Sequence, residues 1–272
     1  MAIDPLAEDK VTLARIEEAV DVAGSVPVNW ASLAERNWGS ACVEALWNQP
    51  LKVCESLGHA FDTDLVQQAD SAGHTRIRRQ DLFALAATLD DRPSEPELVR
   101  FLVNVNAWGY GTSGYAEYRT RTVLGDPDSP RREQFVASAL QGLAILREHG
   151  PVAAYYWFNN GNQGHVPSWG PAFFTKFLYF ADPRNQPDKP GGALILDQRI
   201  DQRVHEFVAG DAPLWPRHRR GTWRTPHYAS YLALLQRFAE HTAVDQPRSD
   251  RVEAVLFRPD PGNPQPTQGA NT

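Results

Sequence analysis

Residues 159–204 read NNGNQGHVPSWGPAFFTKFLYFADPRNQPDKPGGALILDQRIDQRV, and this is the most informative part of the chain. A tight turn at 167–171, Pro-Ser-Trp-Gly-Pro, is followed by an aromatic run that carries Lys176. A loop rich in proline and glycine comes next, and a short apolar run then ends at Asp197. Because proline interrupts helices and aspartate is a preferred N-cap, this order predicts a turn, a helix, a loop and a second helix that begins after Asp197.

Outside this stretch, apolar residues recur at helical spacing along most of the chain, which predicts an all-α fold with few or no strands. Residues 252–257 fit either a strand or a last helical turn, and no pair of runs indicates a β-hairpin. We expect one domain of two helical lobes over 1–258. A disordered tail should follow, because 259–272 is rich in Pro, Gly, Asn and Gln. The expected helices are 11–23, 30–47, 79–89, 95–107, 131–149, 151–158, 173–181, 198–209 and 226–241.

The composition is that of a globular protein without a membrane-spanning segment. Hydrophobic residues make up 42% of the 272 residues, yet no apolar run approaches the roughly 18 residues that a spanning helix needs. The N-terminus is acidic and lacks the apolar region of a secretory signal. Cys42 and Cys54 are the only cysteines, and their spacing fits no zinc or iron–sulfur site. We therefore expect a cytoplasmic protein that holds no metal.

The net charge of −6 argues against nucleic-acid binding, but phosphate contact depends on local patches rather than on the total. Arginines outnumber the four lysines and gather in short clusters. The segment 213–227 holds four arginines, two histidines and no acidic residue. It fits either phosphate contacts, through Arg217, Arg219 and Arg220, or a solvated loop.

The order of turn, lysine helix, Gly/Pro loop and aspartate resembles the core of the helix-hairpin-helix DNA glycosylases. It is most similar to the bacterial 8-oxoguanine DNA glycosylase-fold proteins, which carry a Trp-Gly-Tyr-Gly segment like that at 108–111. The resemblance covers roughly 82–257 and is most specific over 164–204. It implies a nucleoid-associated monomer that flips a modified base, with 8-oxoguanine the first candidate, out of double-stranded DNA. The N-glycosidic bond of that base is then cut, with no cofactor.

The resemblance assigns the chemistry to two residues. In that family an aspartate at a helix N-terminus stabilises the positive charge that develops on the sugar, and a lysine attacks C1′. The matching residues here are Asp197 and Lys176, and we expect both to face one cleft between the lobes. Asp197 also fits a plain N-cap, which is compatible with catalysis. A plainer role is also open for Lys176: its apolar stem could be buried while its amine reaches solvent. Its aromatic neighbours, however, would desolvate the amine.

Two positions depart from the family pattern. The nucleophilic lysine normally stands two residues after the last hairpin glycine, which is Gly170, but Ala172 stands there in this chain. Lys176 follows one helical turn later on the same face. Ser168 replaces the glycine that usually follows the hairpin proline. These departures leave two functions open: a glycosylase, with or without lyase activity, and a glycosylase-fold protein that binds DNA or a modified base without cutting it, in repair or in defence against modified phage DNA.

The resemblance adds the hairpin to the expected DNA contacts, beside the arginines of 213–227. The hairpin would bind a DNA phosphate through backbone N–H groups, and its carbonyls would hold a monovalent cation. The expected DNA-binding residues are Val166, Ser168, Gly170, Ala172, Arg217, Arg219 and Arg220. The expected base-binding residues are Trp108, Tyr110, Phe173 and Trp169, although the aromatic residues of 108–118 also fit plain core packing. A helical interaction protein unrelated to DNA is the third interpretation.

Overall fold

Helices make up nearly all of the regular structure. The computed structural model describes residues 2–7, 9–30, 47–50, 74–77, 79–110, 116–159, 161–185, 192–208, 223–241 and 248–257. Its elements are α1 (Lys10–Ser25), β1 (Trp47–Pro50), β2 (His74–Ile77), α4 (Arg79–Ala87), α5 (Glu95–Tyr110), α6 (Ala116–Leu124), α7 (Pro130–His149), α8 (Pro151–Phe158), α9 (Pro171–Ala181), η3 (Pro183–Asn185, a 3-10 turn), α10 (Gln198–Phe207), α11 (Thr225–His241) and α12 (Ser249–Phe257). The short strands β1 and β2 pair antiparallel. The prediction of an all-α fold with few strands is confirmed.

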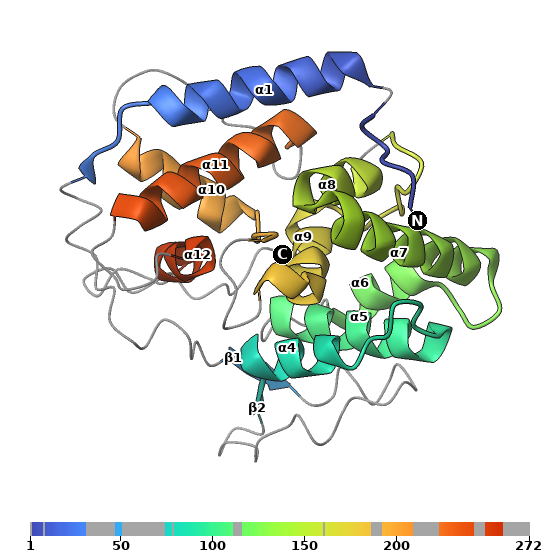
Figure 1. Ribbon diagram of the computed structural model, residues 1–272. Helices are drawn as coiled ribbons and strands as arrows, with labels where there is room; N and C mark the ends of the chain where they lie inside the picture. Colours follow the sequence, from blue (N-terminus) through green and yellow to red (C-terminus); the bar gives the residue numbers. More distant parts are fainter. Residues whose placement is uncertain are drawn as a thin grey trace, which may run out of the picture.

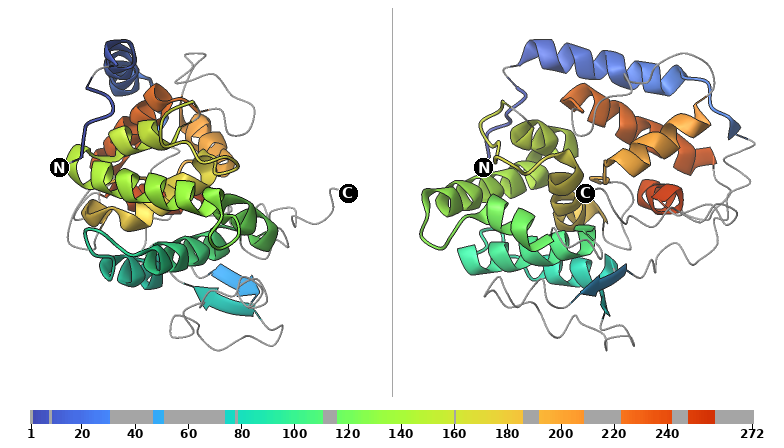
Figure 2. Two further views of the ribbon diagram at one scale, coloured as in Figure 1. Left: turned by 90° about the vertical axis from the view of Figure 1, so that its right-hand side faces the viewer. Right: turned by 180° about the vertical axis from the view of Figure 1, so that it is seen from behind.

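Helices α8 and α9 lie between two groups of helices (Figure 1). Helices α1, α10, α11 and α12 lie on one side, with α1 packed along α11, and α4 to α7 lie on the other side. The view from behind in Figure 2 shows the same division. Helix α9 packs against α4, α5 and α7, while α8 packs against both α9 and α11. The central pair therefore connects the two groups, and their division into lobes of one domain stays a prediction.

Helix α9 is buried on nearly all sides. Its sequence, PAFFTKFLYFA, places large apolar side chains all round the helix, and Phe174, Phe177 and Phe180 are fully covered. Gly170 is its N-cap, and Pro171 occupies the first turn, where the missing N–H costs no hydrogen bond. One cluster of buried side chains runs through α9 from α1 to α12. Because its neighbours fix α9 from several directions, the polar residues it carries have little freedom to move.

The expected helices that fall in the described ranges are present, with ends that differ by a few residues. The ambiguous run 252–257 is the end of helix α12, so the strand alternative is wrong. The sequence does not predict α6, because the glycines that precede it suggest an irregular segment, and it does not predict the β1–β2 pair. Residues 31–46 of the expected helix 30–47 lie outside the described residues, and its last residue belongs to β1. The tail 259–272 also lies outside the described residues.

Candidate active site

Helix α9 carries Lys176 on a buried face, with its side chain directed back toward the start of the helix. Side chains in an α-helix lean toward the N-terminus, so a residue covers the turn that precedes it. The amine Nζ accordingly donates a hydrogen bond to the carbonyl of Ala172, one turn earlier, at 2.7 Å. The side chain is 6% exposed, so the amine does not extend into solvent. The amine of Lys176 therefore lies one turn before its own position in the helix, beside the backbone of Ala172.

Asp197 lies at the start of α10, and its two carboxylate oxygens have different partners. Oδ1 accepts hydrogen bonds from the backbone N–H groups of Arg199 and Ile200, both at 3.1 Å, which makes Asp197 the N-cap of α10. Oδ2 accepts from Nζ of Lys176, also at 3.1 Å. The capping and ion-pairing roles therefore coexist, because each uses a separate oxygen.

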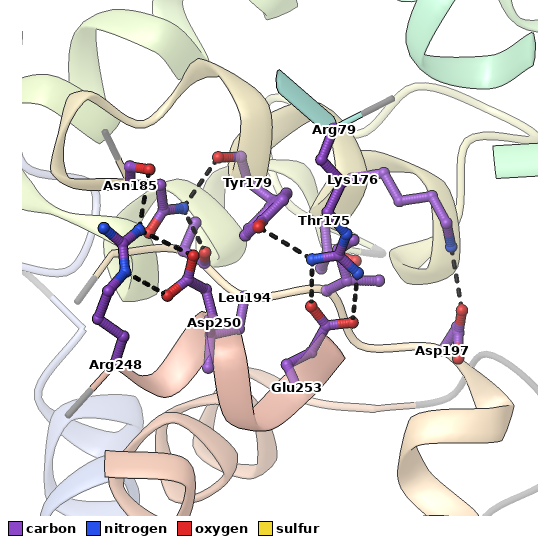
Figure 3. A network of polar contacts seen from close by, with 12 residues as sticks. Arg79, Thr175, Lys176, Tyr179, Asn185, Leu194, Asp197, Arg248, Asp250 and Glu253 are labelled. Carbon is purple, nitrogen blue, oxygen red and sulfur yellow. Dashed lines mark hydrogen bonds and ion pairs between the residues drawn. The ribbon is translucent and has the colours of Figure 1, made fainter. Parts of the chain in front are cut away.

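The Lys176–Asp197 pair joins two segments that are 21 residues apart, and Figure 3 shows the two side chains pointing toward each other. The side chain of Asp197 is 15% exposed, and that of Lys176 is more deeply buried. Water screens a pair with this burial only partly, so each charge acts strongly on the other. A partly desolvated amine in contact with a carboxylate can exchange a proton with it, and the carboxylate can stabilise a cation that forms nearby.

Aromatic side chains and a glycine form the wall beside Lys176. Nζ lies 5.5 Å from the centroid of the Phe173 ring, and this ring stacks on that of Tyr110, with the two centroids 4.2 Å apart. Burial raises the pKa of Tyr110 to about 12, so its phenol stays neutral near pH 7. Gly109 packs against the lysine stem: a Cβ at this position would lie 2.8 Å from Cδ of Lys176. The stem of Lys176 therefore needs glycine at position 109 to keep its present path.

The hairpin before α9 is a tight turn stabilised by α7. Trp169 donates its backbone N–H to the carbonyl of Val166 at 3.1 Å. Ser168 adopts a φ of 69°, in the left-handed region that favours glycine. Arg131 of α7 donates to the Pro167 carbonyl at 2.9 Å. Ser168 therefore adopts, with backbone strain, a conformation that glycine would adopt without it.

The other expected site residues fall into three groups. Trp108 and Trp169 are buried in the core, whereas Tyr110 and Phe173 are partly exposed and stack on each other. The expected DNA-binding residues of the hairpin lie together before and at the start of α9, with Val166 buried and Ser168 exposed. Arg217, Arg219 and Arg220 lie outside the described residues. The assignment of these residues to base or DNA binding stays a prediction, as does the shared cleft.

Sequence reasoning missed two residues that contact this site. Gly109 was noted only as part of a glycine-rich segment, and its packing on the lysine stem could not be inferred because the two residues are far apart in sequence. Arg199, two residues after Asp197, is partly buried beside it. Burial and the nearby Arg203 lower the pKa of Arg199, and Asp197 opposes that shift. Its position in the first turn of α10 was the signal that could have found it.

Among the described residues, no group of three or more His, Cys, Asp and Glu side chains is arranged to hold a metal ion. None of the described helices combines the length and apolar character needed to cross a membrane.

Comparison with known proteins points to one family. The family model described as "OGG: Putative 8-oxoguanine DNA glycosylase OGG-like protein" matches residues 37–257, which include every element of the site. No curated protein and no solved structure matches the chain.

Proposed function

The chain belongs to the OGG-like family of 8-oxoguanine DNA glycosylase relatives, and from that premise we propose that it excises a modified base from double-stranded DNA. An oxidised purine is the expected substrate class, and 8-oxoguanine is the first member to test. The protein would meet this substrate as a monomer on the DNA of the nucleoid.

The contact between Lys176 and Asp197 carries the proposal. The amine and carboxylate come from separate segments, meet at 3.1 Å, and are both largely buried. Ordinary helix capping accounts for Oδ1 of Asp197 but not for the lysine that meets Oδ2. The amine also donates to the carbonyl of Ala172, so the lysine leans back along α9 toward the turn in which the family pattern has its lysine. This backward lean supports a lysine nucleophile despite the changed sequence position.

The reaction would begin with a proton transfer. Lys176 passes one proton to Oδ2 of Asp197 or to water, which leaves a lone pair on Nζ. As the C1′–N bond to the base breaks, the base departs with the bonding electrons and takes up a proton, and Nζ forms a bond to C1′. The bond between C1′ and the ring oxygen then breaks, one proton of Nζ passes to that oxygen, and a protonated imine forms between Nζ and C1′. A proton taken up by Asp197 is passed on to the departing base or to water, so the carboxylate is negative again when the sugar becomes cationic and can stabilise that charge.

The hairpin and the start of α9 would hold the DNA backbone. Helix N-termini carry unsatisfied N–H groups and a partial positive charge, which favour a phosphate. Gly170 has open space where a side chain would be, since a Cβ there would meet nothing within 4 Å. A backbone phosphate could therefore approach closely, and a monovalent cation on the hairpin carbonyls would add a second positive group.

The test is incubation with a short duplex that carries one 8-oxoguanine, with and without borohydride. Wild-type protein should release the base, and borohydride should trap it covalently on the lesion strand by reducing the imine. Lys176→Arg keeps a cation beside Asp197 but cannot form the imine, so trapping should vanish. Lys10→Ala removes an exposed lysine of α1 and should trap like the wild type.

The alternative outcomes separate the candidate functions. Base release without trapping would mean that water, directed by Asp197, is the nucleophile and that the lyase activity is absent. Tight binding without release from a panel of modified bases would support a non-catalytic reader of DNA. Binding that is unaffected between low and moderate salt would contradict any DNA role, because each neutralised phosphate adds close to one unit to the log–log salt slope.

A further inference from the structure

In the apolar run 193–196, which leads to Asp197, the backbone forms its hydrogen bonds mainly with side chains. Residues 193–196 are buried and adopt neither helix nor strand. Buried backbone N–H and C=O groups need hydrogen-bond partners, which a neighbouring strand would normally supply. Here the first residue of the run is bonded by two side chains: Asp182 accepts from the N–H of Ala193 at 2.8 Å, and Asn185 donates to its carbonyl at 2.6 Å.

Thr175 bonds the last residue of the run, directly behind the Lys176–Asp197 pair. Its hydroxyl accepts from the N–H of Leu196 at 3.1 Å and donates to the carbonyl of Pro171 at 2.6 Å. Donation to Pro171 uses the only hydrogen of the hydroxyl, so its oxygen meets Leu196 as an acceptor. Thr175 precedes the lysine and Leu196 precedes the aspartate, so one buried hydrogen bond connects the two segments next to the Lys176–Asp197 pair.

Two tyrosines of α11 bond the middle of the run. The hydroxyl of Tyr228 accepts from the N–H of Leu194 and donates to the carbonyl of the same residue, both at 3.0 Å. Tyr231, one turn along the same face of α11, donates to the carbonyl of Ile195 at 2.7 Å. Burial raises the pKa of both phenols above the ordinary value, so both stay protonated and able to donate throughout the neutral and mildly alkaline range.

We propose that Thr175, together with Tyr228 and Tyr231, is a positioning residue that sets the distance between the amine of Lys176 and the carboxylate of Asp197. The inference rests on the proposed function for its effect on rate, but the geometry it describes exists without substrate. A misplacement of about 1 Å at a reacting group can cost about 100-fold in rate. The hydroxyls touch neither reacting atom, so they act only through the backbone they hold.

The activity test compares Thr175→Val with Thr175→Ser on the 8-oxoguanine duplex. Valine has the shape of threonine but no hydroxyl, and we expect base release at saturating duplex to slow about tenfold or more, with unchanged duplex affinity. Serine restores the hydroxyl and should restore the rate. Thr120→Val is the matched control, because Thr120 is a buried threonine whose hydroxyl accepts from Asn106, away from 193–196. Tyr231→Phe is the second test variant, with Tyr155→Phe, which loses a bond to the carbonyl of Trp223, as its control.

A second readout needs no substrate. The chain has four lysines, so protein labelled with ¹³C at lysine Cε gives few signals, and Lys176→Arg identifies the one from Lys176. Thr175→Val should change the chemical shift of the Lys176 signal, because the carboxylate facing the amine moves. Thr175→Ser and Thr120→Val should leave it as in the wild type.

The two readouts separate failure of this inference from failure of the proposed function. A wild-type protein that cuts no modified base while its Lys176 signal still responds selectively to Thr175→Val would support the positioning role and contradict the glycosylase proposal. A Lys176 signal and a base-release rate that both survive Thr175→Val and Tyr231→Phe would overturn the positioning role. Equal losses in Thr175→Val and Thr120→Val would also overturn it, because they would reflect general destabilisation.

Discussion

At the level of single residues, one oxygen of Asp197 caps α10 and the other accepts from Lys176, and these separate roles lead to a prediction about Asp197→Asn. Asparagine is nearly as good an N-cap as aspartate, so the start of α10 should persist. The amide cannot stabilise a developing cation, so base release should fall about 100- to 1,000-fold. Loss of the bond to the buried amine should cost about 1–3 kcal/mol of unfolding free energy. Single-turnover base release and urea denaturation measure the two effects.

Asp9→Asn is the matched control for that variant. Asp9 is the N-cap of α1, where its side chain accepts from the N–H of Thr12, and it has no contact with the site. This control should release base at the wild-type rate. A wild-type rate of base release in Asp197→Asn itself would show that Asp197 acts only as a helix cap.

Gly109→Ala should change the stability of the fold in opposite directions depending on whether Lys176 is present. Replacing glycine by alanine in a helix normally stabilises it by about 0.5–1 kcal/mol. In the wild-type background, however, the new Cβ would lie 2.8 Å from the stem of Lys176, so Gly109→Ala should destabilise the fold and reduce borohydride trapping. In a Lys176→Ala background the obstacle is gone, and the same change should stabilise the fold. Urea denaturation of the four proteins completes a double-mutant cycle, and additive effects would refute the contact.

The sequence predicted the two residues that meet but not what brings them together. Lys176 and Asp197 could be selected because each stands in a recognisable local pattern, and helical geometry placed the amine one turn back. The hydroxyls of Thr175, Tyr228 and Tyr231 could not be selected, because buried threonines and tyrosines are common in helices. Their partners lie between 21 and 36 residues away in the chain. Contacts of that kind follow from how helices pack, and no local spacing encodes them.

At the scale of elements, the hairpin leads to a prediction about Ser168→Gly. A non-glycine residue in the left-handed region costs about 1–2 kcal/mol, and the entropy that glycine adds to the unfolded chain offsets part of the gain. Because Ser168 has a φ of 69°, Ser168→Gly should stabilise the protein by about 0.5–1 kcal/mol in urea denaturation.

Gly161 offers the opposite change in the same loop. Its φ is 87°, and a Cβ there would meet nothing within 4 Å, so Gly161→Ala adds backbone strain without a collision. We expect it to destabilise by a similar amount. If Ser168→Gly lowered stability, the turn conformation described here for 166–170 would be wrong.

Helices were predictable where the apolar spacing is regular and a clear stop signal ends the element. Helix α8, for example, lies between a Gly-Pro step and an Asn pair, and its predicted and observed bounds agree. Helix α6 was missed because its sequence, AEYRTRTVL, is short and mostly polar, and because a glycine-rich segment precedes it. Helix α12 was ambiguous because its apolar run is too short to show a period, and packing against α10 and α11 is what favours the helix.

At the scale of the whole molecule, a buried ion pair links the two groups of helices. Arg79 of α4 donates to both carboxylate oxygens of Glu253 in α12, at 2.8 and 3.2 Å, and also to the hydroxyl of Tyr179 in α9 (Figure 3). Both charged side chains are almost fully buried. Burial raises the pKa of Glu253, and the arginine opposes that shift.

Glu253→Gln should therefore destabilise the protein by about 3–5 kcal/mol, because it leaves the guanidinium buried without a counter-ion. Thermal unfolding should show a fall of roughly 2–4 °C for each kcal/mol. Glu206→Gln, which breaks an exposed pair with Arg203 on α10, should change stability by less than about 1 kcal/mol. Similar melting temperatures for Glu253→Gln and the wild type would show that this pair does not link the groups.

The way residues 193–196 are held also bears on which changes in chain length the protein can accept. A strand in a ladder can slip by two residues and regain equivalent bonds, because every rung is alike. Here the four residues are bonded by side chains of different kinds, each at a fixed place, so a shifted alignment would find no equivalent set of partners. Insertions or deletions at 186–191 should thus leave the hydrogen bonds of 193–196 unchanged, and Asp197 should keep its contact with Lys176. The same change between residues 193 and 197 should separate the aspartate from its lysine.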